Sequence, residues 1–251
     1  MFPIENIPVQ TLVYAFIGGV LPVFIWLYFL LKEDDRCPEP RTIVAIAFVA
    51  GMISVLISLP LALLFREYAY TVFTTCASYL PLCAPIVIGW SVIEESAKYA
   101  VAALFVLWRK DVNEPVDFVI YMITVALGFA ALENVFFLLT PFGEGNFMGG
   151  LANNNLRFIG ATLLHVIASS AIGFTLALAF GRSIFVRAVA VAAGLILAVT
   201  LHAVFNFFIL NGGGLETLLA FFVVWTGLIL YFALFEVLRY VRYRNLPKNT
   251  C

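Results

Sequence analysis

Nine residues capable of chemistry lie within the long apolar stretches of this chain. They are Glu94, Glu95, Lys98, Glu133, Asn134, Arg157, His165, His202 and Asn206. An Asp, Lys or Arg at the centre of a membrane helix costs roughly 2.5–3.5 kcal/mol, so such residues usually mark a function. The structural alternative is a polar clamp between helices. Four separate stretches each contribute an ionisable group, and this number favours a functional site.

The spacing of these residues predicts which of them share a helix face. Residues four positions apart lie on one face, so His202 and Asn206 point the same way, as do Glu94 and Lys98. Glu95 points about 100° away from Glu94. We therefore expect the two carboxylates to divide their roles. One faces the cavity, and the other pairs with a neighbouring helix, with Arg157 as a candidate partner.

Two hydrolytic chemistries remain open for this set. In the first, a shielded carboxylate is the general base toward a trapped water, an imidazole orients that water, and an Asn amide with a His N–H holds the oxyanion. In the second, Glu133, His165 and His202 bind zinc, with another Glu as the base. The H-E-x-x-H zinc signature is absent. No Ser or Cys has a base partner at fixed spacing, which sets nucleophilic catalysis aside.

The composition places these residues in a membrane protein. The chain is 63% hydrophobic and 12% charged, whereas soluble domains have about 25% charged residues. A net charge of −1 gives no reason to expect a nucleic-acid partner. We predict an all-α, polytopic membrane protein with about seven transmembrane helices. The chain is expected to form a single membrane domain over residues 1–251, with the catalytic helices at roughly 80–210.

A membrane span needs about 20 apolar residues. Seven such stretches are predicted, at residues 10–31, 42–64, 80–108, 116–140, 154–181, 184–210 and 215–239. The first is read as a span rather than a signal peptide, because no Lys or Arg precedes it. The segment 65–80 is ambiguous, since it carries Arg66 and Glu67 and could lie on the surface or dip into the bilayer.

The basic residues predict an orientation. Of the 14 Lys and Arg residues, 11 fall on the loops after the first, third and fifth spans and on the C-terminal tail. Only Arg66 lies on the opposite side. The positive-inside rule then places the N-terminus outside and the C-terminus in the cytoplasm of a cell membrane. Counted from the outer ends of their spans, Glu94, Glu133, His165 and His202 all lie roughly 10 to 20 Å deep, so they form one layer in the outer half of the membrane.

Four motifs resemble the PrsW group of intramembrane proteases, which is related to the CAAX prenyl-protease and bacteriocin-processing membrane enzymes. The motifs are Glu94-Glu95-Ser96-Ala97-Lys98, Glu133-Asn134, His165 and His202-Ala203-Val204-Phe205-Asn206. Each lies on a separate predicted span, and the resemblance extends over the third to sixth spans, about half of the chain. A single motif of this kind is weak evidence for membership of a family, but four motifs in this order are fairly specific to the group.

The resemblance implies an endopeptidase that cleaves a membrane-anchored protein, either an anti-sigma-factor-like protein or another single-span protein, on its outer side. It implies that Glu94 is the catalytic glutamate with Glu95 beside it and that His165 positions water. It also implies that His202 with Asn206 stabilises the oxyanion. Lys98, Glu133, Asn134 and Arg157 would line the cavity or support the site. Both metal-dependent and glutamate-dependent mechanisms have been described for the group, so zinc or no cofactor remain the two options.

Two other functions are compatible with the polar residues. A non-catalytic scaffold would use them to bind partner helices and would tolerate Gln at position 94. A proton-coupled transporter would use them as a relay, but such proteins often show repeated halves with interrupted spans, and no repeat is visible here. Cys76 and Cys83 could form a disulfide in an oxidising compartment or remain two unpaired apolar residues.

Overall fold

The computed structural model describes residues 8–33, 38–72, 84–151, 160–211 and 214–243, and these are almost entirely helical. The helices are α1 (Val9–Glu33), α2 (Arg41–Val72), α3 (Ala84–Ala102), α4 (Pro115–Gly143), α6 (Ala161–Leu178), α7 (Ile184–Asn211) and α8 (Gly214–Tyr243). A π-helical turn, η3 (Ala103–Leu107), continues α3. The described residues contain no strand, and the predicted all-α fold is confirmed.

Six of these helices are long and apolar enough to cross a membrane, namely α1, α2, α4, α6, α7 and α8. Helix α3 falls short of that criterion because it carries Glu94, Glu95 and Lys98 within its 19 residues. The three charges belong to the group of polar residues identified above. The chain is therefore a multi-pass membrane protein, and its most polar helix carries three of the candidate site residues.

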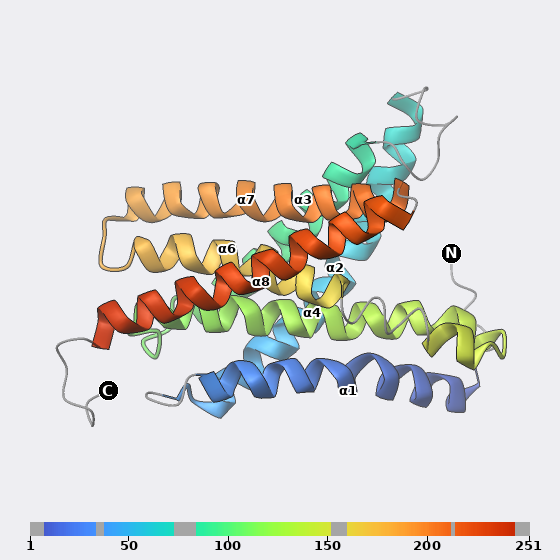
Figure 1. The fold of residues 1–251 in the computed structure, drawn as a ribbon, viewed down its shortest axis with the longest axis horizontal. Helices are drawn as coiled ribbons and strands as arrows, with labels where there is room; N and C mark the ends of the chain where they lie inside the picture. Colours follow the sequence, from blue (N-terminus) through green and yellow to red (C-terminus); the bar gives the residue numbers. More distant parts are fainter. Residues whose placement is uncertain (1–7, 34–37, 73–83, 152–159, 212–213, 244–251) are drawn as a thin grey trace.

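Helix α4 is the centre of the bundle. Every residue from Val116 to Ala131 is buried, and α4 packs against α1, α2 and α6 (Figure 1). A helix that is hydrophobic all round is one that protein surrounds. Its start is fixed by Pro115 in the first turn and by the Asp117 carboxylate, which accepts hydrogen bonds from the backbone N–H groups of Asn113 and Glu114, both at 2.8 Å. Helices α7 and α8 leave most of their apolar surface exposed, as expected for lipid contact.

The contact between α2 and α4 depends on two glycines. A Cβ atom at Gly128 would collide with the backbone carbonyl of Phe48, and one at Gly51 would collide with the carbonyl of Val125. Small residues at such crossings let two membrane helices approach closely, which is how helices associate where lipid removes the hydrophobic driving force. This crossing fixes the position of α4, the helix that carries Glu133.

The glycine crossing yields a stability prediction. Gly128→Ala should destabilise the protein by about 1–3 kcal/mol, the usual cost of overpacking, because backbone atoms on α2 cannot move aside as a flexible side chain can. Gly143→Ala is the matched control in the same helix, where an added Cβ meets no atom within 4 Å. Thermal unfolding of both variants in detergent measures the difference. Equal melting temperatures for the two variants would show that the crossing is looser than described.

The end of α2 differs from the predicted span. Helix α2 continues to Val72, so Arg66 and Glu67 extend a helix instead of ending it. They lie near its end, where their side chains form a partly exposed pair at 3.4 Å, and this relieves the cost of their charge. Residues 73–83 are outside the described part of the chain. The ambiguous segment is therefore resolved only to Val72, and the question of whether Cys76 and Cys83 are paired falls outside the described residues.

Candidate active site

The site is built from four adjacent helices, α3, α4, α6 and α7, in which α3 contacts the other three and α6 contacts both α4 and α7. Their direction alternates, so the start of α3, the end of α4, the start of α6 and the end of α7 lie at the same end of the bundle (Figure 1). Glu94 lies ten residues from the start of α3, and Glu133 lies ten residues before the end of α4. His202 lies nine residues before the end of α7. At 1.5 Å per residue, these depths of about 15 Å agree, and the side chains meet.

Glu95 is the most tightly held residue of the group. Its side chain is 0% exposed. One carboxylate oxygen, Oε1, lies 2.5 Å from Lys98 Nζ and 2.8 Å from His202 Nδ1. The other, Oε2, accepts a hydrogen bond of 3.0 Å from the Ser169 hydroxyl. Both oxygens are thus used to connect α3 with α6 and α7.

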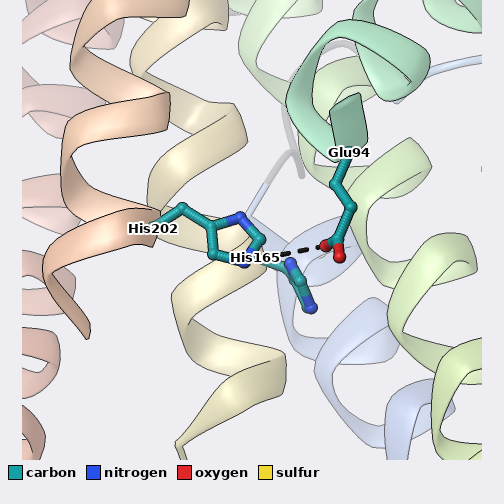
Figure 2. A group of neighbouring side chains, drawn as sticks. All are labelled: Glu94, His165 and His202. Carbon is teal, nitrogen blue, oxygen red and sulfur yellow. Dashed lines mark ion pairs between the residues drawn. The ribbon is translucent and has the colours of Figure 1, made fainter. Parts of the chain in front are cut away.

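Glu94 has the opposite character. Its side chain is 17% exposed, and Oε2 lies 3.6 Å from His202 Nε2, longer than a hydrogen bond but within ion-pair range. Figure 2 shows this contact as a dashed line. Within the described part of the chain, this buried oxygen accepts no hydrogen bond. A buried acceptor without a donor is rare in folded proteins and points to a missing water, ion or substrate.

His165 lies between the other groups. Its Nδ1 is 2.9 Å from Lys98 Nζ, and its Nε2 is 3.1 Å from the Oε2 atom of Glu133. The ring centroid is 5.0 Å from that of His202 and 5.0 Å from that of Phe129. Lys98 Nζ lies 4.3 Å above the centre of the Phe129 ring. His165 is therefore fixed on every side by protein.

The two histidines and Glu94 could hold a metal ion. One oxygen of Glu94 and one nitrogen from each of His165 and His202 all lie within 4.8 Å of one another (Figure 2). Two His and one carboxylate are a ligand set used by catalytic zinc sites. The hydrogen bond from His202 Nδ1–H to Glu95 leaves His202 Nε2 bare and aimed at Glu94, which is the arrangement that carboxylate–histidine–metal sites use. The set thus fits a metal in type and position, with Glu94 where the sequence suggested Glu133.

The remaining predicted residues lie around this centre or outside the described residues. Asn134 is buried and donates a 3.3 Å hydrogen bond to the Thr162 hydroxyl. Asn206 is half-buried, one turn beyond His202 on α7. Arg157 is outside the described residues, so its suggested pairing with Glu95 is not described. Lys98 was expected to share a helix face with Glu94. Its ammonium pairs instead with Glu95, which lies three positions before Lys98, a spacing that also brings two side chains together on a helix.

Two residues of the site were missed from the sequence. Ser169 lies four positions after His165, and Phe129 lies four positions before Glu133. Each therefore shares a helix face with a residue that was singled out. The same spacing rule that paired His202 with Asn206 would have found both of them.

Comparison with known proteins identifies the family. Residues 39–235 match the family described as PrsW family intramembrane metalloprotease. The chain is 29% identical over 197 residues to Protease PrsW of Geobacillus kaustophilus, covering 77% of this chain and 78% of that protein. It is 25% identical over 126 residues to Protease PrsW of Clostridioides difficile, covering 50% of each. No solved structure matches. The match spans α2 to α8 and contains every residue of the site, so the chain belongs to the PrsW family of intramembrane proteases.

Proposed function

We propose that this protease hydrolyses a peptide bond of a membrane-anchored protein near the outer leaflet, with water activated by Glu94. The observation that carries the proposal is the Glu94 Oε2 atom, which accepts no hydrogen bond among the described residues and lies 3.6 Å from His202 Nε2. The Glu95 oxygens are committed to structural contacts, and Glu133 faces His165. Glu94 is therefore the carboxylate best placed to take a proton from water.

The proposed reaction uses the side chains in a fixed order. The Glu94 carboxylate accepts a proton from a water molecule while the water oxygen attacks the peptide carbonyl carbon. The tetrahedral oxyanion is stabilised by N–H donors, for which Asn206, on the same face of α7 as His202, is the candidate. Protonated Glu94 then transfers the proton to the leaving amine as the C–N bond breaks. Glu95 keeps the His202 ring in place throughout, through its 2.8 Å contact with Nδ1.

The metal-dependent route remains the second form of this proposal. Glu94, His165 and His202 would hold a divalent ion, and the ion would supply Lewis-acid activation of water and of the peptide carbonyl. Zinc suits two imidazoles and a carboxylate better than Mg²⁺ or Ca²⁺, which prefer oxygen ligands. The family description as metalloproteases supports this route.

A chelator separates the two routes. The protease is reconstituted in liposomes with an anti-sigma-factor-like single-span protein, and the products are followed by mass spectrometry. If a metal is required, a membrane-permeant chelator should abolish cleavage and added zinc should restore it. If Glu94 acts alone, cleavage should continue at the untreated rate. Restoration by zinc in the wild type but not in His202→Ala would tie the ion to this site, and restoration in both would place the ion elsewhere.

The location of cleavage follows from the proposed orientation. With the N-terminus outside, the shared end of α3, α4, α6 and α7 that lies nearest the site is the outer end. The site is then about 15 Å below the outer surface by helix rise. A substrate cut there would be anchored in the same cell membrane and would lose its outer portion.

Reporter fusions test this orientation. A reporter that is active only outside the cytoplasm should be active when inserted at Gly145, in the exposed turn after α4, and inactive when fused after Cys251. A cytoplasmic reporter should give the reverse pattern. Cytoplasmic activity at Gly145 would invert the orientation and move the proposed cleavage to the inner leaflet.

A further inference from the structure

We propose that the Lys98 ammonium and a bound metal ion exclude each other at His165, so that Lys98 must leave His165 before the site can bind a metal through both histidines. This inference rests on the proposed metal route, because it concerns the same three ligands. It assigns Lys98 a role that the hydrolytic chemistry does not require, as a positioning residue that controls which ligands are available.

The contacts of Lys98 fix it firmly next to His165. Its side chain is 0% exposed, and its ammonium is 2.5 Å from Glu95 Oε1 and 2.9 Å from His165 Nδ1. The face of the Phe129 ring lies 4.3 Å from the same nitrogen. A carboxylate, an imidazole lone pair and an aromatic face are all groups that attract a cation. These three contacts hold the Lys98 nitrogen beside His165.

The ammonium determines the tautomer of His165. An ammonium donates three hydrogen bonds and accepts none, so Nδ1 of His165 must be the acceptor. The ring proton of neutral His165 is then on Nε2, where it is donated to Glu133 Oε2 at 3.1 Å. Both nitrogens of His165 are therefore occupied, one by a donor and one by an acceptor.

Either way of binding a metal through His165 conflicts with Lys98. If Nε2 binds the metal, a neutral ring carries its proton on Nδ1, and that proton would point at the ammonium, which has no acceptor to offer. If Nδ1 binds the metal, the ion must lie where Lys98 Nζ now lies, 2.9 Å away. Both arrangements require the ammonium to move.

His202 does not share this conflict. Its Nδ1–H is donated to Glu95, a carboxylate that only accepts, and its Nε2 is left facing Glu94. Two of the three ligands, Glu94 and His202, are therefore ready for a metal, and the third, His165, is held by Lys98.

Zinc titration of the purified protein in detergent tests the competition without an activity assay. Lys98→Met removes the ammonium and should tighten zinc binding by about 10- to 100-fold, the range that a hydrogen bond to a charged group is worth. Lys98→Arg is the matched control. A guanidinium also donates without accepting, so the dissociation constant should stay near that of the wild type. Adding His165→Ala to Lys98→Met should remove the gain, because the gain comes from freeing that ring.

Lys98→Met leaves the buried Glu95 without its cation, which destabilises the fold. A second variant therefore tests the competition without an unpaired buried charge. Lys98→Met/Glu95→Gln removes the pair together. The Gln oxygen can still accept from His202 Nδ1–H, and its amide can donate to Ser169. This double variant should show the same tightening.

The outcomes distinguish this inference from the proposed function. Equal zinc affinity in the wild type and both Met variants, with binding lost in His202→Ala, would overturn the competition and leave the metal site intact. Absence of zinc binding in every variant would overturn the competition together with the metal route, while hydrolysis by Glu94 alone would stand. Tight binding in the Met variants, weak binding in the wild type and Lys98→Arg, and loss of the gain with His165→Ala would support it.

Discussion

Glu94→Gln is expected to lower the rate of substrate cleavage by about 10²-fold or more, the range for losing general-base catalysis. Gln preserves the size of the side chain and its hydrogen-bonding capacity but cannot take a proton from water. The buried Oε2 position next to His202 becomes an amide group, and the cost of a buried charge is removed. Folding should therefore survive. Cleavage of a co-reconstituted single-span substrate and the melting temperature in detergent are the two measurements.

Glu67→Gln is the matched control for this variant. Glu67 lies near the end of α2 with its side chain 71% exposed, and within the described part of the chain it pairs with the neighbouring Arg66. Its replacement should leave cleavage and stability unchanged, since exposed pairs contribute little. A fully active Glu94→Gln protein would show that Glu94 is structural and would favour the alternative function, a non-catalytic scaffold. A Glu94→Gln protein that fails to fold would instead mean that the charge of Glu94 holds the helices together.

His202→Ala should be at least as damaging to cleavage, by about 10²-fold or more under either chemistry. The substitution removes the partner of Glu94 at 3.6 Å, the contact with Glu95 and one ligand of the candidate metal set. Asn206→Ala, one turn away on α7, should slow cleavage by roughly 10²-fold if its amide donates to the oxyanion. It should leave zinc binding intact, because Asn206 is not among the ligands.

Zinc content distinguishes the reasons for these two losses. A His202→Ala protein that has lost zinc along with activity supports the metal route. The same protein with unaltered zinc content but no activity supports an orienting role for the imidazole. Wild-type cleavage by His202→Ala would remove this residue from the site, whatever the metal content.

The sequence predicted the helices well because apolar length alone determines where a chain can span a membrane. The errors fell where charge and apolarity compete. The prediction ended the second span at residue 64, before Arg66 and Glu67, but α2 continues to Val72 since charges near a helix end can reach outward. Helix α3 was predicted as a span from its apolar length despite three charges, and in the structure Glu95 and Lys98 pair with each other and with groups on α6 and α7.

The convergence of the site could also be predicted, since depth along each helix depends only on the rise per residue. The partners within the site could not. Glu95 and Glu94 both lie within one turn of Lys98, and the spacing rule allows either pairing. The rotation of α3 against α6 and α7 decides between them, and it places Glu95 against Ser169 and His202. That rotation depends on tertiary packing, which a single sequence does not show.

The most direct test of the account is the rate of the Glu94→Gln/His202→Ala double variant, compared with both single variants and the wild type on one reconstituted membrane-anchored substrate. Residues that act as one catalytic unit are strongly non-additive, so the double variant should be no slower than the slower single variant. All three should lie about 10²-fold or more below the wild type, with the protein still folded. Cleavage by the double variant at the wild-type rate and at the same bond would contradict the assignment of the active site.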